Sequence, residues 1–350
     1  MQLKNYISDL KGRDLITTQE WGLEEIRATI DLARELRIIY EKNGGRIPWD
    51  FLDKRTFIML FYAPSTRTRS AFETAMNLLG GQAQYITGTM TREGESKKDT
   101  AKMYEIYGDG IGVRLLDDAI DFIHGNGNKV LREFALHSQK PVINMADDTF
   151  HPTQALGDFM TLEDKLRKLQ GKKYVLMWAY APVPRGYCSM NSEMLLGTRL
   201  GMDMVVARPK GFDLPDEVVK MAEENVKQSG GSLEFSEDYK GALSGAHVAF
   251  PRSWISKKMA EEGYRKFWEE EKQIYEKYRN WRLKKEDLDL MDRKGIITHV
   301  LPVLRGYEAD DEVMDSKKSV IYEQAKNNLF AKGSVLLQTL GIVDDRRSKK

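Results

Sequence analysis

A short run of hydroxyl and guanidinium side chains stands where an anion could bind. The run Ser-Thr-Arg-Thr-Arg at 65–69 follows an apolar stretch at 56–62 and precedes an amphipathic stretch at 71–79. A strand, a hydroxyl-rich turn and a helix start in this order present backbone N–H groups and the positive end of the helix dipole to a ligand. Arg67 could add a forked contact to phosphate. The alternative is that the hydroxyls only cap the helix and the arginines face solvent, but two arginines and three hydroxyls together favour the anion site.

Two further polar segments lie at the ends of apolar stretches. The segment Gly110–Arg114 ends in an arginine, and the stretch at 141–145 runs into His151 and Gln154. Ligands of open α/β sheets gather at the carboxyl ends of strands, so a guanidinium, an imidazole and an amide could meet one small polar ligand there. For His151 alone, a hydrogen-bonded structural role is the alternative.

The elements that must position these residues follow a regular rhythm. Short apolar stretches, each followed by an amphipathic stretch, recur from end to end and predict βα units around parallel sheets, which is the α/β class. The expected strands are 56–62, 82–86, 110–114 and 141–145 in the first half, and 174–178, 203–207, 247–250 and 295–300 in the second. This division suggests two similar lobes, and we expect a helix over 153–169 to connect them.

Composition excludes several classes of protein. The chain has 350 residues, of which 41% are hydrophobic, and 54 Lys and Arg stand against 53 Asp and Glu, a formal charge of +1. It is therefore expected to be globular, with no global field for a nucleic acid or an anionic membrane. The single cysteine, Cys188, cannot form an internal disulfide or a thiolate zinc cluster and fits a reducing compartment. No stretch approaches the ~20 apolar residues of a membrane span, so we expect a soluble cytoplasmic protein.

Four motifs in register resemble the signature set of the aspartate and ornithine carbamoyltransferase family. They are Ser65-Thr66-Arg67-Thr68-Arg69, Gly112-Val113-Arg114, His151-Pro152-Thr153-Gln154 and His299-Val300-Leu301-Pro302. The resemblance implies two doubly wound α/β domains with parallel sheets, residues 1–150 for carbamoyl phosphate and 151–325 for the acceptor amine. It also implies that a C-terminal helix at 326–350 packs back on the first domain, and that the protein is a homotrimer with active sites at subunit boundaries.

The same resemblance implies a role for each matching residue. Ser65, Thr66, Arg67 and Thr68 would hold the phosphate, Thr68, Arg114 and His151 would contact the carbamoyl oxygen, and Gln154 and the backbone around Leu301 would receive the carbamoyl amino group. A neutral amine attacks the carbonyl carbon, and each preorganised donor to the oxygen is worth ~3 kcal/mol by analogy with other oxyanion sites. Because an oxygen of the departing phosphate can take the amine proton, the reaction requires no side-chain base, metal or organic cofactor.

A second resemblance narrows the branch. The segment at 175–184, followed by Asn191-Ser192 and by Arg199–Asp203, is similar to the proline-containing loop of the knotted carbamoyltransferases. That branch includes N-acetylornithine and N-succinylornithine enzymes and a group of unassigned acceptor. The resemblance implies a trefoil knot in the second domain, and the alternative is a short proline turn that leads into a helix.

The acceptor side departs from the ornithine pattern. Val300 stands where ornithine enzymes usually have cysteine, and the Asp-x-x-x-Ser-Met-Gly loop is replaced by a segment that contains Arg252 and Trp254. Basic residues in place of an acidic contact favour a carboxylate on the ligand over a second ammonium. The stretch at 301–308 is similar to the aspartate branch, which implies that Arg305 binds an acceptor carboxylate, with a surface ion pair as the alternative. We therefore assign acceptor binding to His299, Arg305, Arg252 and Trp254, and expect a small amine with at least one carboxylate.

The loop at 88–100 reaches into the neighbouring subunit's site in relatives. Glu93 stands where the aspartate branch has lysine, and Arg92, Lys97 or Lys98 could compensate, unless the loop is only a solvated surface. The rival function is a catalytically silent, anion-binding or regulatory homologue. A nucleotide-binding Rossmann enzyme is disfavoured because no Gly-x-Gly-x-x-Gly follows the first strand.

Overall fold

The computed structural model describes residues 3–87 and 95–342, which form two units. The first unit comprises the described residues of 1–119, 125–160 and 326–350, and the second comprises Ile120–His124 and Thr161–Ala325. The division falls inside helix α5 (Pro152–Leu166), after Met160, and not at residue 150 as the sequence suggests. A helix that is continuous across the division hides the boundary from sequence patterns.

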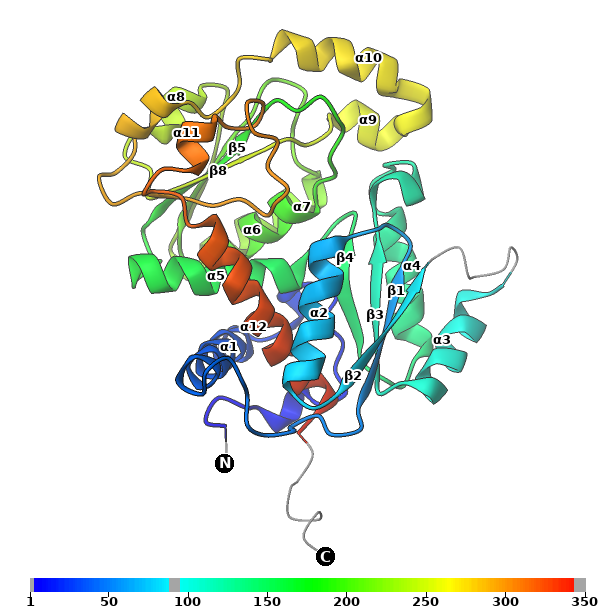
Figure 1. The fold of residues 1–350 in the computed structure, drawn as a ribbon. Coiled ribbons are helices and arrows are strands. Elements are labelled where there is room, and N and C mark those ends of the chain that lie inside the picture. The colour runs from blue at the N-terminus through cyan, green and yellow to red at the C-terminus, as the bar shows by residue number, and fades with distance from the viewer. Residues whose placement is uncertain (1–2, 88–94, 343–350) are drawn as a thin grey trace, which may run out of the picture. The chain divides into compact units, whose positions relative to one another are not determined.

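The first unit is built on a four-stranded parallel sheet in the order β2-β1-β3-β4 (Figure 1). Its strands are β1 (Thr56–Phe61), β2 (Gln82–Thr87), β3 (Gly110–Leu115) and β4 (Val142–Asp147). Every side chain of β1 and β4 is buried, as expected for parallel strands covered on both faces. The chain leaves β1 toward β2 and then returns to β3 on the other side, so the strand order reverses between β1 and β3.

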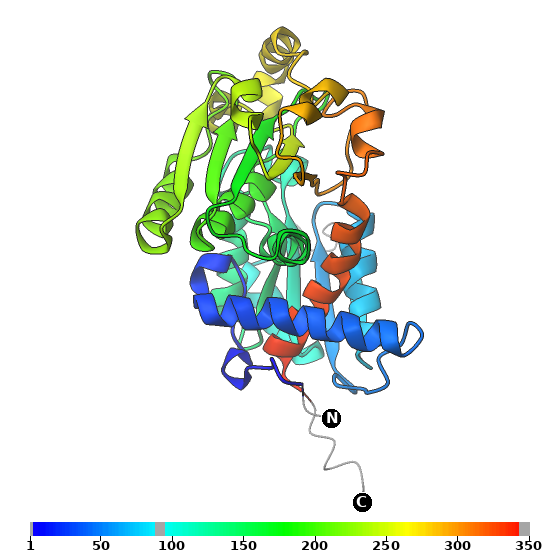
Figure 2. The same cartoon turned by 90° about the vertical axis from the view of Figure 1, so that its left-hand side faces the viewer.

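Helices cover both faces of this sheet. Helix α2 (Thr66–Leu78) follows β1 on one face, and α3 (Lys97–Tyr107) and α4 (Asn126–His137) lie on the other (Figure 1). Helices α1 (Leu23–Lys42) and α12 (Ile321–Leu340) pack beside α2, and Figure 2 shows α1 crossing α12. The rings of Tyr40 and Phe330 lie 5.3 Å apart, and Arg37 Nη1 donates to Asn327 Oδ1 at 2.7 Å. The chain after residue 325 therefore packs in the first unit as far as it is described, and 343–350 lie outside the described residues.

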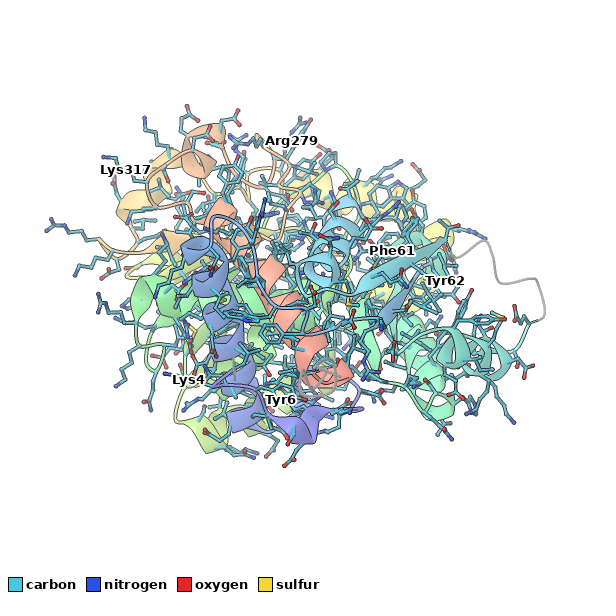
Figure 3. All side chains as sticks on the ribbon, turned by 60° about the horizontal axis from the view of Figure 1, so that its bottom comes forward. Lys4, Tyr6, Phe61, Tyr62, Arg279 and Lys317 are labelled. Atoms are coloured by element: carbon cyan, nitrogen blue, oxygen red, sulfur yellow. The ribbon has the colours of Figure 1, made fainter. Side chains whose placement is uncertain are left out.

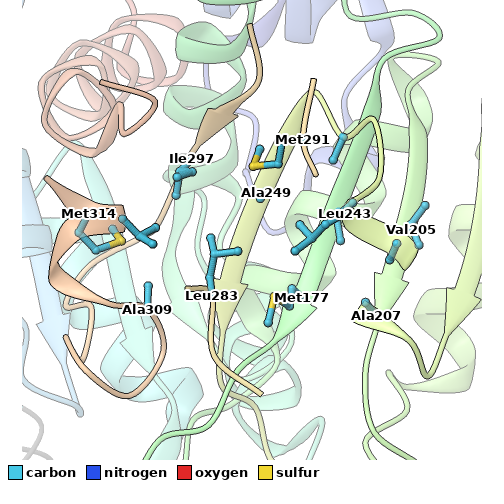
Figure 4. Close-up of a cluster of buried hydrophobic side chains, with 14 of the residues drawn as sticks. Met177, Val205, Ala207, Leu243, Ala249, Leu283, Met291, Ile297, Ala309 and Met314 are labelled. Atoms are coloured by element: carbon cyan, nitrogen blue, oxygen red, sulfur yellow. The ribbon is translucent and has the colours of Figure 1, made fainter. Parts of the chain in front are cut away.

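The second unit is built on a five-stranded parallel sheet in the order β7-β6-β5-β8-β9. Its strands are β5 (Lys173–Trp178), β6 (Asp203–Ala207), β7 (Ser232–Ser236), β8 (Val248–Arg252) and β9 (Ile296–Ile297). Its helices are α6 (Cys188–Arg199), α7 (Asp216–Ser229), α8 (Tyr239–Leu243), α9 (Lys257–Glu262), α10 (Tyr264–Lys277) and α11 (Asp311–Met314). A core cluster that includes Met177, Val205, Ala249, Leu283 and Met314 packs against this sheet (Figure 4).

The α/β class with two parallel-sheet units is confirmed, and two strands differ from the sequence prediction. Strand β7 is missing from the prediction because it is a half-exposed edge strand, Ser-Leu-Glu-Phe-Ser, without an apolar run. Strand β9 is shorter than the expected 295–300. The N–H of His299 donates to Gln324 Oε1 at 3.0 Å, so the backbone has left the sheet ladder at this point. The trefoil knot stays a prediction.

Among the helices of residues 3–87 and 95–342, none combines the length and the apolar character needed to cross a membrane.

Candidate active site

Strand register brings three of the sequence-predicted segments to one edge of the first sheet. Phe61 at the end of β1 pairs with Arg114 of β3, and Arg114 pairs with Ala146 of β4. Figure 3 labels Phe61 and Tyr62, where β1 ends and the 65–69 run follows. The pairing shifts between Val113 and Arg114, and such irregularities re-aim side chains next to active sites. Because the strand order reverses between β1 and β3, this carboxyl edge is the expected ligand position.

Helix α2 begins at this edge with its N-terminus prepared for an anion. Ser65 is the N-cap residue, and its Oγ accepts the N–H of Thr68 at 3.3 Å. The first-turn N–H groups of a helix have no acceptor within the helix, and the dipole makes this end positive. Thr66 and Arg67 are exposed, whereas Thr68 is buried. The hydroxyl of Ser65 thus caps the helix, which is the alternative role expected from the sequence. The cap uses only one of the first-turn N–H groups, so the N-terminus of α2 can still bind phosphate.

The two arginines of the run differ in their surroundings. Arg69 Nε lies 2.9 Å from Glu73 Oε1, and its guanidinium lies 3.9 Å from the centroid of the Tyr85 ring. Arg69 is therefore held along α2 and against β2. Arg67, exposed in the first helical turn, is the arginine better placed to reach a ligand at the helix start.

A buried turn between β4 and α5 places His151. Asp147 Oδ1 accepts the N–H groups of Thr149 at 2.8 Å and Phe150 at 2.5 Å. Asp148 accepts the N–H groups of Gly125 and Asn128. Burial, together with the charge of the adjacent Asp148, raises the pKa of Asp147 to about 7. The sequence motifs do not single out this aspartate pair, although two carboxylates between a strand and a His-Pro helix start are a usable signal.

The raised pKa of Asp147 predicts a pH-dependent stability. Between the ordinary value of 3.8 and about 7 the folded chain holds a proton that the unfolded chain has lost. The contribution of Asp147 to the free energy of unfolding is therefore fully present below pH 3.8. It is lost as the pH rises through 7, and the loss amounts to at most about 4 kcal/mol. Asp147→Asn should flatten this part of the pH profile in urea denaturation. The exposed control Asp118→Asn should leave the profile unchanged, and an unaltered slope in Asp147→Asn would contradict the assignment.

A second buried polar group lies where α5 and α12 meet in the first unit. Gln154 Nε2 and Asn328 Nδ2 both donate to Asp158 Oδ1, each at 2.8 Å, and Lys332 Nζ donates to Asn328 Oδ1 at 3.1 Å. Burial lowers the pKa of Lys332 to about 8, against the opposing charge of Asp158 and with a contribution from Arg114. Of this group, the sequence motifs indicate only Gln154. The signal that could have revealed the rest is the pair of polar residues four positions apart on each of two apolar helices.

In the second unit, His299, Arg252 and the Leu301 backbone gather around Glu308. His299 Nδ1 accepts the Leu301 N–H at 2.9 Å, and Nε2 lies 3.3 Å from Glu308 Oε2. An accepting Nδ1 means that the ring is neutral with its proton on Nε2, and burial lowers the pKa of His299 in agreement. Burial alone would raise the pKa of Glu308, but the contact with the His299 ring, the charge of Arg252 and the Leu304 N–H act to lower it.

Two arginines, Arg252 and Arg185, follow the carboxyl ends of β8 and β5. Arg252 pairs with Trp178 at the end of β5, and its Nη1 lies 3.7 Å from Glu308 Oε1. Arg185, in the loop after β5, accepts the Ile255 N–H through its carbonyl oxygen, and its charge helps to lower the pKa of His299. Strand order reverses at β5 and β8 in this sheet too, so the second unit has its own ligand position with positive charge beside it.

Two of the predicted acceptor residues lie in other surroundings. Trp254 is fully buried, and its indole N–H donates to the Phe212 carbonyl at 2.9 Å, so the free protein holds its side chain in the core. Arg305 lies 3.0 Å from Asp311 and 2.7 Å from Asp315, which is the ion pair that the sequence left as the alternative. The burial of Trp254 is not visible in the sequence, because it depends on contacts with residues distant along the chain.

The loop at 88–100 is only partly within the described residues. Arg92 and Glu93 lie outside them. Lys97 begins α3, and its Nζ lies 5.7 Å from the centroid of the Tyr62 ring, close to the end of β1. Lys98 is exposed on the same helical turn. Within residues 3–87 and 95–342, no three His, Cys, Asp or Glu side chains gather in a way that could hold a metal ion.

Comparison with protein families shows which family the chain belongs to. Residues 13–164 match the model of "Aspartate/ornithine carbamoyltransferase, carbamoyl-P binding domain", and residues 180–339 match "Aspartate/ornithine carbamoyltransferase, Asp/Orn binding domain". The chain belongs to the aspartate/ornithine carbamoyltransferase family. The resemblance seen in the sequence motifs is thereby confirmed, and so is the enzyme class, carbamoyltransferase.

Named relatives of the carbamoyltransferase chain fall into two acceptor classes. An ornithine carbamoyltransferase of Pyrococcus abyssi is 36% identical over 337 residues, 96% of this chain and 98% of the relative. An N-acetylornithine carbamoyltransferase of Xanthomonas campestris is 31% identical over 352 aligned positions, 94% of this chain and 98% of the relative. The relatives therefore do not select one acceptor for this enzyme.

Solved structures show the same two classes. An N-acetyl-L-ornithine transcarbamylase superposes with a TM-score of 0.83 at 30% identity, covering 93% of this chain and 98% of its own. The ornithine carbamoyltransferase of Pyrococcus furiosus superposes with a TM-score of 0.81 at 34% identity, covering 97% and 100%. A variant of an N-acetyl-L-ornithine transcarbamylase was solved with carbamyl phosphate and N-succinyl-L-norvaline.

Proposed function

We propose that this carbamoyltransferase transfers the carbamoyl group of carbamoyl phosphate to the amine of a small, carboxylate-bearing acceptor and releases phosphate. The observation that carries the donor half is the carboxyl edge of the first sheet. There the capped start of α2, Arg114 and the turn before His151 follow strands that are paired in register. The match of residues 13–164 to a carbamoyl-P binding domain supports the same donor.

Each proposed donor contact follows from local chemistry. The first turn of α2, with Ser65, Thr66, Arg67 and Thr68, holds the phosphate through N–H groups, hydroxyls and a guanidinium. Thr68, Arg114 and His151 donate to the carbamoyl oxygen, where negative charge develops in the tetrahedral intermediate. Gln154 receives the carbamoyl amino group.

The reaction balances with the two substrates alone. The nitrogen lone pair of the neutral amine forms the new C–N bond, and the bond between the carbonyl carbon and the phosphate oxygen breaks with its electrons. A phosphate oxygen takes the proton that the amine loses. The protein contributes by holding the two reactants in line and by stabilising the oxyanion.

The acceptor half is proposed for the second unit. The match of residues 180–339 to an Asp/Orn binding domain supports this assignment. Arg185 and Arg252 place positive charge near the ends of β5 and β8. The nearby carboxylate of Glu308 is fully buried and accepts the N–H groups of Ser253 and Leu304. These surroundings favour a carboxylate on the acceptor over a second ammonium. Val300 also leaves no thiol beside His299, unlike the usual ornithine pattern.

A matched pair of variants tests the acceptor assignment. Arg252→Gln should raise the KM of the acceptor about tenfold or more, since a charge-assisted bond is lost, while the KM of carbamoyl phosphate stays unchanged. Arg305→Gln loses only partly exposed ion pairs and should leave both constants nearly unchanged. Steady-state kinetics with each substrate varied in turn gives both values. If Arg305→Gln weakened the acceptor as strongly as Arg252→Gln, the role implied by the aspartate-branch resemblance would stand instead.

The function itself is tested by incubating the protein with carbamoyl phosphate and a panel of amino acids and their N-acyl derivatives. Ureido product and phosphate should appear in equal amounts with at least one carboxylate-bearing amine. Calorimetry with phosphonoacetyl-aspartate, run beside the assay, separates the rival function. Tight binding without turnover on any amine would show a silent anion-binding homologue.

Three further expectations from the resemblance belong to this proposal. They are a homotrimer with shared active sites, a trefoil knot in the second unit and a cytoplasmic location. Sedimentation equilibrium tests the first of them directly, because a homotrimer predicts three times the chain mass of 40.2 kDa.

A further inference from the structure

A buried chain of hydrogen bonds joins α12 to α5 in the first unit and ends on Gln154. It runs from Lys332 Nζ to Asn328 Oδ1 at 3.1 Å and from Asn328 Nδ2 to Asp158 Oδ1 at 2.8 Å. Gln154 Nε2 donates to the same Asp158 oxygen at 2.8 Å. Lys332 is 3% exposed and Asp158 is 1% exposed, so both charged groups are out of water.

The carboxylate of Asp158 sets the orientation of the Gln154 amide. An ionised carboxylate only accepts hydrogen bonds, so Gln154 must turn Nε2 toward Asp158 and Oε1 away from it. The opposite orientation would place two acceptor oxygens together. Held in this way, Gln154 offers a ligand an acceptor. A carbamoyl group presents an NH₂ donor and a carbonyl acceptor, and only the NH₂ can pair with Oε1.

Lys332 brings a cationic group into this buried chain, and its ammonium reaches the Asp158 carboxylate through the side chain of Asn328. Buried charges persist when they are paired, and the negative charge of Asp158 acts to raise the pKa of Lys332 against the larger effect of burial. The charge of Arg114, the arginine proposed for the carbamoyl oxygen, acts in the opposite direction and lowers the pKa of Lys332. The Lys332 ammonium further lies 5.7 Å from the centroid of Phe72 on α2, the helix whose start is proposed to hold phosphate.

The hydrogen-bond chain depends on close packing of α5 against α12 at Gly157. A Cβ atom at Gly157 would lie 2.7 Å from Asn328 Cγ and 2.8 Å from Asn328 Cα. Glycine therefore allows α5 and α12 to approach until Asn328 can bridge Lys332 and Asp158. No step of the proposed reaction uses Lys332, Asn328 or Asp158. Burying the charge of a lysine lowers stability, so packing alone does not explain why a lysine stands at this position.

We propose that Lys332 is a positioning residue for carbamoyl recognition. Through Asn328 and Asp158 it holds Gln154 with Oε1 toward the carbamoyl amino group, and this gives the enzyme its preference for a carbamoyl group over an acyl group of the same shape. The inference rests on the proposed function and deepens it, because it names the acyl phosphates as the donors that the site rejects.

Two unreactive phosphonates test the proposal by calorimetry. Phosphonoacetamide carries the NH₂ group, and 2-oxopropylphosphonate carries a methyl group in its place. The wild-type protein should bind phosphonoacetamide at least about tenfold more tightly, since one hydrogen bond and one unmatched acceptor separate the two ligands. Lys332→Met should reduce this preference to less than about threefold by weakening phosphonoacetamide alone. Asp158→Asn should do the same, and it provides the test if Lys332→Met fails to fold.

A double variant distinguishes positioning from a general structural role. In a Gln154→Ala background the preference is already lost, so adding Lys332→Met should leave the ratio of the two dissociation constants unchanged. The proposal would be overturned if Lys332→Met weakened the binding of both phosphonates equally. It would also be overturned if adding Lys332→Met to Gln154→Ala changed the ratio of the two dissociation constants further. Equal binding of both phosphonates by the wild type would overturn it as well. Failure of the wild type to bind either phosphonate would contradict the proposed function itself.

Discussion

Replacing Arg67 with alanine is expected to raise the KM of carbamoyl phosphate about a hundredfold, the equivalent of roughly 3 kcal/mol for a charge-assisted bond to phosphate. Arg67 is exposed in the first turn of α2, so its side chain contributes little to the core. Thermal unfolding of the variant should therefore stay close to that of the wild type. Steady-state kinetics with carbamoyl phosphate varied, together with a melting curve, measures both effects.

Arg69→Ala is the matched control for this prediction. Arg69 has the same charge, lies two residues later on the same helix and is held by Glu73 and Tyr85. Its loss should leave the KM of carbamoyl phosphate within about threefold of the wild-type value, because it removes a partly exposed ion pair and a ring contact. Equal effects of the two substitutions would indicate a general loss of positive charge and not a phosphate contact by Arg67.

Replacing Arg114 with glutamine should lower kcat about a hundredfold to a thousandfold, the range seen when one donor to an oxyanion is removed. The guanidinium acts on charge that develops only in the transition state, so the KM of carbamoyl phosphate should change much less. Arg114→Lys should recover part of the rate, since it restores the charge but not the forked geometry.

Arg55 provides the control for Arg114 on the same sheet. Arg55 precedes β1 at the opposite edge, and its Nη1 lies 2.6 Å from Asp109, which precedes β3. Arg55→Gln should lower the melting temperature and leave kcat unchanged. A fall in kcat of similar size in both variants would mean that the loss in Arg114→Gln reflects damage to the sheet.

Much of the proposed donor site can be predicted from the sequence because its signals are local. The run at 65–69 follows a buried strand directly, and its place at the start of α2 depends only on the strand and the helix around it. The assembly of this run with Arg114 and His151 follows from a general property of parallel sheets, whose strands end at one edge.

The remaining features depend on contacts between distant parts of the chain. Nothing near Lys332 in the sequence indicates that it lies buried in one hydrogen-bond chain with Asp158, because most of the second unit lies between α5 and α12 along the chain. The environment of Trp254 is equally nonlocal, since its indole bonds to Phe212. Arg305 is a different case, because its partners Asp311 and Asp315 are near in sequence. The sequence alone does not favour the ion pair over acceptor binding, because the pair depends on the short helix α11 that places the two aspartates.

Glu308 links two distant segments at the proposed acceptor end of the second unit. Its single carboxylate accepts the N–H groups of Ser253 at 3.1 Å and Leu304 at 2.8 Å, and it faces His299 and Arg252 as well. Two segments that lie far apart along the chain are thus fastened to the same two oxygen atoms. An exchange of one amine substrate for another during evolution would then require coordinated replacements in both segments, and single substitutions transplanted from an ornithine enzyme should fail to transfer its preference.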